Sequence, residues 1–171
     1  SCRGQLGGFD ESTLQSNVDG DPTKYSVSYF APYANGGNMV PYTDFELYLM
    51  GMIPLSDVHP FTAFNSIDSY SRDQSTGKYT FFSQDKTVYN SASLEEILGA
   101  RVPDYTTSQK SFNVLFVVVS SATLTTEEYA NYDASIESFC KPSSDGISAI
   151  YNFWEATRGL STLTAENLNA S

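Results

Sequence analysis

Two carboxylates, Asp44 and Glu46, have the clearest potential for chemistry in this sequence, because both stand at the start of a predicted helix. They are two positions apart, so they project from different faces of a helix and do not form a glycosidase pair by spacing. Carboxylates in a first helical turn also stabilise the helix N-terminus. Two hypotheses follow: the carboxylates are structural, or one of them completes a metal site whose histidines lie elsewhere.

The other side chains that could carry catalysis are few. His59 is the only histidine, so the chain holds no H-E-x-x-H zinc motif, and no serine or cysteine partner for it is evident. We interpret it as a loop residue. The run Asn-Val-Asp-Gly-Asp at 17–21 resembles a fragment of a calcium loop. It lacks the later bidentate carboxylate, and a polar turn is the simpler interpretation. The sequence therefore predicts no catalytic residue.

Tyrosine is the most frequent aromatic side chain, with 12 copies among the 171 residues. Tyr29 and Tyr33 are predicted to lie in polar loops or at strand edges, where an aromatic ring can meet a sugar or another ligand. Together with Asp44 they are the candidate ligand-binding residues. Tyr129 and Tyr132, at helical spacing, are expected in the core.

Cys2 and Cys140 are the only cysteines. An even count in a chain rich in Ser, Thr and Tyr and poor in Lys fits an oxidising compartment. A disulfide between them would close nearly the whole chain into one loop, which the chain-entropy model values at roughly 4–5 kcal/mol. The alternative is a pair of buried free thiols.

Capping boxes predict where the helices that position these groups begin. In three places a Ser or Thr precedes a Glu by three residues, at Thr43, Ser93 and Thr125. A last helix is predicted to start at Asp145. Alternating or apolar runs predict strands at 25–30, 61–64, 78–82 and 86–89, with a turn at 75–77.

The longest apolar run, 114–119, is strand length, and its continuous apolar character predicts burial on both faces. We therefore expect an α+β fold: a single domain, 1–171, of three to four helices packed on a small, mostly antiparallel sheet with strand 112–119 at its centre. No run of 18 apolar residues is present, so no membrane span is expected. The formal net charge of -11 repels phosphate backbones, so nucleic acid is not expected as a partner.

Several segments resemble, in order, the later part of a family of secreted bacterial metallopeptidase-like proteins. The most specific is Leu-Tyr-Leu-Met-Gly at 47–51, which follows a Gly-Gly pair at 36–37; the segments 94–103, 110–119 and 153–159 continue the likeness. In that family an H-E-x-x-H helix lies upstream, in a part that would precede Ser1. An acidic residue occupies the position of Glu46, so the resemblance implies Glu46 as a zinc ligand if a histidine-bearing half completes the site.

The resemblance implies a secreted, extracellular domain related to the C-terminal half of a zinc metallopeptidase-like protein. As an isolated chain it would be non-catalytic, with a binding or structural role. Its partner would be the histidine-bearing N-terminal half or another extracellular protein, and zinc would belong to the complete assembly only. Two alternatives remain: a free-standing extracellular binder of carbohydrate or a small molecule, and a processed chain of an active zinc metallopeptidase.

Overall fold

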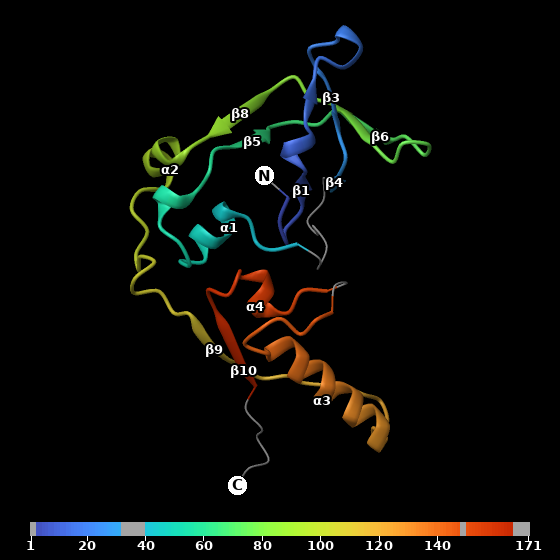
Figure 1. Ribbon diagram of the computed structural model, residues 1–171, viewed down its shortest axis with the longest axis vertical. Helices are drawn as coiled ribbons and strands as arrows, with labels where there is room; N and C mark the ends of the chain where they lie inside the picture. The colour runs from blue at the N-terminus through green and yellow to red at the C-terminus, as the bar shows by residue number, and fades with distance from the viewer. Residues whose placement is uncertain (1–2, 32–39, 148–149, 166–171) are drawn as a thin grey trace.

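The computed structural model describes residues 3–31, 40–147 and 150–165. They form an α+β fold of four α-helices and several small, mostly antiparallel sheets, which confirms the predicted class. In Figure 1 the four-stranded sheet and the β9–β10 pair lie at opposite ends of the molecule, with α1 and α4 between them.

The largest sheet is antiparallel, with the strand order β2-β3-β7-β6. Its strands are β2 (Gln15–Ser16), β3 (Lys24–Val27), β7 (Tyr79–Phe82) and β6 (Ser69–Arg72). Phe81 is fully buried at its centre. The ring centroid of Phe81 lies 4.8 Å from that of Phe30 and 5.4 Å from that of Tyr25. This aromatic cluster is the main core of the N-terminal part.

Two short antiparallel pairs extend this framework. β1 (Gly8–Phe9) pairs with β4 (Phe30–Ala31), and β5 (Phe61–Phe64) pairs with β8 (Lys86–Tyr89). The predicted strands 61–64 and 86–89 are thus confirmed. Three 3-10 turns connect these elements. η1 (Glu11–Thr13) lies between β1 and β2, η2 (Val18–Gly20) between β2 and β3, and η3 (Leu55–Asp57) before β5.

Helix α1 (Asp44–Leu49) begins where its capping box predicts, because the Thr43 and Glu46 side chains and backbones bond reciprocally. Its buried residues are Leu47 and Tyr48, and Tyr48 packs with Val58 and Leu94 in a second core cluster. Helix α2 (Ser91–Leu98) begins earlier than predicted. Its N-cap is Asn90, whose side chain accepts from the Ser93 backbone N–H.

The C-terminal part departs most from the prediction. β9 (Ser111–Val114) pairs in parallel with β10 (Thr162–Ala165), and α4 (Phe153–Ala156) lies before β10. The predicted buried strand 112–119 is wrong: the strand stops at Val114, and Val117 and Val119 are 72% and 92% exposed. The helix predicted from Asp145 is also wrong, because α4 starts only after Asn152, its N-cap.

Helix α3 (Thr126–Cys140) starts at its predicted capping box, Thr125 with Glu128. It extends from the rest of the molecule at one end (Figure 1). None of its residues is buried. The expectation that Tyr129 and Tyr132 belong to the core is wrong, since they are 55% and 43% exposed.

Candidate functional site

The best-organised polar cluster is centred on Asp44, the first residue of α1. Its Oδ1 accepts from Nη1 of Arg158 at 2.6 Å, and its Oδ2 lies 2.6 Å from Nδ1 of His59. Nη2 of Arg158 donates to the carbonyl oxygen of Tyr42, also at 2.6 Å. The structure thus joins α1, the loop after η3 and the turn after α4 through one carboxylate.

These contacts determine the protonation of the cluster. Burial of Asp44 works to raise its pKa, but the hydrogen bonds from His59 and Arg158 outweigh the burial and lower the pKa below its ordinary value. Because a carboxylate only accepts hydrogen bonds, Nδ1 of His59 carries the proton of the shared bond. The Nε2 atom has no partner among the described residues, and the His59 side chain is 82% exposed.

Two members of this cluster could not be found from the sequence. The sequence predicts His59 only as a loop residue and gives no signal for Arg158, because they lie 15 and 114 positions from Asp44. One signal in the structure marks the position of Arg158, a positive φ of 55°. This conformation is unfavourable by about 1 kcal/mol for a residue with a Cβ, and here it directs the guanidinium to Asp44 and Tyr42.

Both carboxylate oxygens of Glu46 bond within the chain, and its role as a zinc ligand with an external histidine pair stays a prediction. Its Oε1 accepts from the backbone N–H of Leu6 at 2.9 Å, and its Oε2 accepts from the N–H of Thr43 at 2.6 Å. Both oxygens are therefore engaged by backbone donors. Over the described ranges, no three His, Cys, Asp or Glu side chains gather in a way that could hold a metal ion. These contacts favour the structural hypothesis for Glu46.

A pocket of about 290 Å³ lies beside Asp44 and His59. Its apolar lining comes from Leu6, Phe45, Leu49 and Phe61. The ring centroids of Phe45 and Phe61 are 5.1 Å apart. The pocket therefore combines an aromatic wall with an imidazole held by Asp44. Asp44 is among its lining residues, and its role as a ligand contact stays a prediction.

The calcium candidate at 17–21 has its carboxylates otherwise engaged. Asp19 forms an ion pair of 2.5 Å with Lys24. Asp21 accepts from the backbone N–H and the hydroxyl of Thr23, at 2.8 and 2.7 Å. These contacts support a polar turn.

The remaining candidate residues are dispersed. The guanidinium carbon of Arg3 lies 3.8 Å above the ring centroid of Tyr29. Tyr29 does not line the pocket beside Asp44. Tyr33 and Cys2 lie outside the described residues. Cys140 is partly buried and has no disulfide partner in the part of the chain that the structure describes. Burial raises the pKa of its thiol. The Cys2–Cys140 pairing stays a prediction.

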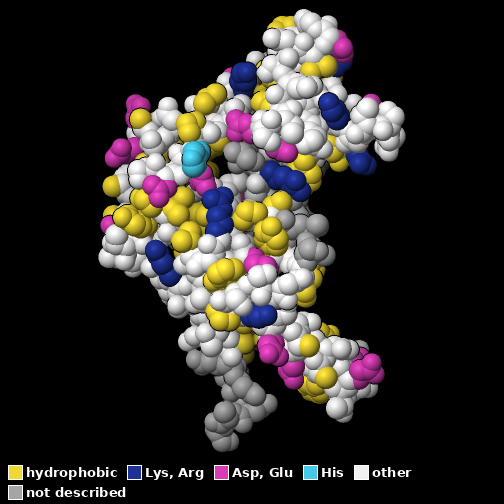
Figure 2. All heavy atoms as spheres, in the orientation of Figure 1, with side chains coloured by type: hydrophobic (Ala, Val, Ile, Leu, Met, Phe, Trp, Pro, Cys, Tyr) yellow, Lys and Arg dark blue, Asp and Glu magenta, His cyan; other side chains and the backbone are white. Residues whose placement is uncertain are grey.

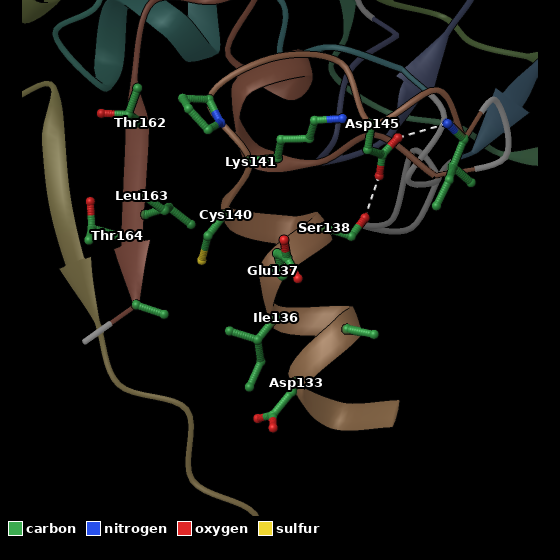
Figure 3. Close-up of a pocket in the computed structure, with 14 residues that line it drawn as sticks. Asp133, Ile136, Glu137, Ser138, Cys140, Lys141, Asp145, Thr162, Leu163 and Thr164 are labelled. Carbon is green, nitrogen blue, oxygen red and sulfur yellow. Dashed lines mark hydrogen bonds between the residues drawn. The ribbon is translucent and has the colours of Figure 1, made fainter. Parts of the chain in front are cut away.

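A second feature is a groove of about 890 Å³ between α3 and β10. Figure 3 shows Ile136 and Cys140 of α3 and Leu163 of β10 beside this space, with Ser138 bonded to Asp145 at 2.5 Å nearby. Large apolar side chains are exposed around the same end of the molecule, where Figure 2 shows hydrophobic side chains scattered among polar and acidic ones. We call this set the apolar face: Leu115, Phe116, Val117, Val118, Val119, Tyr129, Tyr132, Phe139, Ile147 and Ile150.

None of the helices in the described ranges has the length and apolar character needed to cross a membrane. Comparison of the chain with protein-family models, with curated proteins and with solved structures found no match.

Proposed function

We propose that this chain is a non-catalytic, secreted binding domain, related to the C-terminal half of zinc metallopeptidase-like proteins, that binds a partner polypeptide through its apolar face. One observation carries the proposal: the 15-residue helix α3 contains no buried residue, although it presents apolar side chains. Clustered exposed apolar side chains mark an interaction site, and the ring centroids of Phe116 and Phe139, 6.2 Å apart, join the segment 115–119 to α3. The partner suggested by the sequence resemblance is the histidine-bearing half.

The backbone beside α3 offers a way of binding. β9 pairs with β10 along one edge, and in the described part of the chain no strand pairs with its other edge. The chain continues from Val114 through five exposed apolar residues, 115–119. An extended segment of a partner can add to such an edge, gaining main-chain hydrogen bonds and covering alternate side chains.

The charge of α3 selects the kind of partner. The helix contains Glu127, Glu128, Asp133 and Glu137 and no Lys or Arg. A second copy of the chain would place two acidic helices near each other, which is unfavourable. The occupant is therefore an apolar strand of another polypeptide, flanked by Lys or Arg.

Synthetic peptides test this assignment. The probe is acetyl-Lys-Val-Thr-Val-Thr-Val-Lys-amide, and its matched control carries Glu in place of both Lys residues. Hydrogen exchange with mass spectrometry measures protection of 114–119. We expect the Lys-flanked peptide to protect this segment and the Glu-flanked peptide to bind at least tenfold more weakly.

Two variants locate the contact. Val117→Asp places a charge at a 72% exposed position of the apolar face, and Val102→Asp does the same at a 90% exposed position outside it. Both should fold normally, because exposed substitutions cost little stability. Only Val117→Asp should abolish protection. Equal binding of the two peptides, protection retained in Val117→Asp, or burial of the face by self-association would each contradict the proposal.

A small-ligand function is the second candidate, and the pocket beside Asp44 favours it. This pocket has apolar walls and a polar group fixed at its border, which are the general properties of a ligand site. It does not depend on the apolar face, and both functions can belong to one binding domain.

A further inference from the structure

The pocket beside α1 contains an oriented hydrogen-bonding atom, Nε2 of His59, that bonds to no described residue. Asp44 holds Nδ1 of His59 at 2.6 Å, and Arg158 holds the other oxygen of Asp44. In the neutral imidazole this bond fixes the tautomer that leaves Nε2 as an acceptor. His59 lines the pocket, and no described residue bonds to its Nε2.

The size and walls of the pocket indicate the shape of its ligand. Its volume of about 290 Å³ is just below the usual range for ligand pockets, roughly 300–1,000 Å³. Phe45 and Phe61 provide an aromatic wall. Leu6 and Leu49, at 67% and 49% exposed, border it and would lose water contact when a ring enters. One aromatic ring satisfies these conditions better than a sugar chain.

The charges at the pocket restrict the ligand further. Asp44 and Glu46 border it, and no Lys or Arg is among its lining residues. Both carboxylates repel an anion. Each of their oxygens already accepts a bond, from Arg158, His59, Leu6 or Thr43. Nε2 of His59 is the pocket acceptor that bonds to no described residue.

We infer that this pocket binds a neutral or cationic aromatic ring that carries one O–H or N–H donor, with the ring against Phe45 and Phe61 and the donor bonded to Nε2 of His59. A free phenol and a tyrosine side chain of a partner share this chemistry. The inference concerns a different surface from the apolar face and stands without it.

Three ring compounds of one size test the inference: 4-methylphenol, toluene and 4-methylbenzoate. They are titrated at pH 8, and the His59, Phe45 and Phe61 ring signals are followed by NMR. We expect saturable shifts with 4-methylphenol, binding of toluene about fivefold weaker for want of the hydrogen bond, and no binding of 4-methylbenzoate. The inference would be overturned if toluene bound as tightly as 4-methylphenol, or if none of the three compounds shifted the ring signals.

Two variants separate the contribution of the hydrogen bond to ligand affinity from that of the apolar lining. His59→Phe keeps a ring but removes the acceptor, so 4-methylphenol should lose its preference over toluene. Leu49→Ala, at a half-exposed position, should weaken both ligands equally. The amide spectrum of each variant checks that it is folded. A preference that persists in His59→Phe would contradict the role of Nε2.

A further arm distinguishes the two sources of the ligand. The tripeptide Gly-Tyr-Gly, blocked at both ends, carries the same phenol on a backbone. Binding equal to that of 4-methylphenol supports a protein side chain as the ligand. Binding of 4-methylphenol alone supports a free small molecule, because the pocket then rejects the attached backbone.

Discussion

Removing the Glu46 carboxylate should destabilise the protein measurably, although no catalytic role is assigned to it. In Glu46→Ala the N–H of Thr43 loses its capping-box partner, a loss worth about 1 kcal/mol. The N–H of Leu6 loses its acceptor as well, and this second hydrogen bond is worth about 1 kcal/mol at this exposed position. The expected loss of unfolding free energy is therefore about 2 kcal/mol, or a Tm lower by roughly 4–8 °C in a chain of this size.

Urea unfolding followed by tryptophan fluorescence and circular dichroism measures this loss. Glu46→Gln is the matched variant: its amide keeps one acceptor oxygen, so it should lose about half as much. A Glu46→Ala variant within about 0.5 kcal/mol of the wild type would refute the assignment. So would zinc that raises the Tm of the wild type but not of the variant, since Glu46 would then be a metal ligand.

Gly4 provides an independent check on the position of this carboxylate. A Cβ at Gly4 would lie 2.0 Å from Oε2 of Glu46 and 2.7 Å from Cγ2 of Thr43. Gly4→Ala must therefore displace a carboxylate that two N–H groups hold. It should cost more stability in the wild type than in the Glu46→Ala background. Strictly additive effects would show that the two residues do not touch.

Three other predictions can be checked by standard measurements. Gly51 and Gly99 both have positive φ, but a Cβ at Gly51 would lie 2.2 Å from Oγ of Ser108, while one at Gly99 would meet nothing within 4 Å. Gly99→Ala should cost about 1–3 kcal/mol in urea unfolding, because its φ of 69° and ψ of -175° are essentially restricted to glycine. Gly51→Ala should cost more because of the added contact with Ser108, and equal costs would contradict that contact. Hydrogen bonds from the Ser75 and Thr76 hydroxyls and backbones lower the pKa of Asp73 to about 2 from its ordinary 3.8. A carboxyl group whose pKa is lower in the folded than in the unfolded state stabilises the fold fully above the unfolded pKa. This contribution to stability is lost as the pH falls through the folded-state pKa. The stability difference between the wild type and Asp73→Ala should thus be constant above about pH 5 and vanish toward pH 2. A difference that does not vary with pH would refute this. A Cys2–Cys140 disulfide predicts no alkylated thiol in denaturant without reductant, as read by mass spectrometry; two alkylated thiols would exclude it.

Local features of the sequence were enough to predict part of the fold. The capping boxes at Thr43 and Thr125 depend on residues three positions apart, and both form as predicted. The strands 61–64 and 86–89 likewise follow from short-range pattern. The box at Ser93 failed because Asn90, three residues earlier, competes as an N-cap and reaches the Ser93 N–H.

Features that depend on distant residues could not be predicted. The contacts that hold His59 and Arg158 come from segments that only the fold brings to Asp44. The run 114–119 is apolar enough for a buried strand, but burial also requires a surface to cover it. The described residues supply no such surface, which is why Val117 and Val119 remain exposed.

The way α1 is anchored has a consequence for the order of folding. A helix of six residues does not persist in water without tertiary contacts. Its first turn is held by the N–H of Leu6, 40 positions before Glu46, and by Arg158, 114 positions after Asp44. Both ends of the chain must therefore close on α1 before it becomes stable. Its amide hydrogens should exchange only when the whole molecule opens, and shortening the chain at either end should melt this helix first.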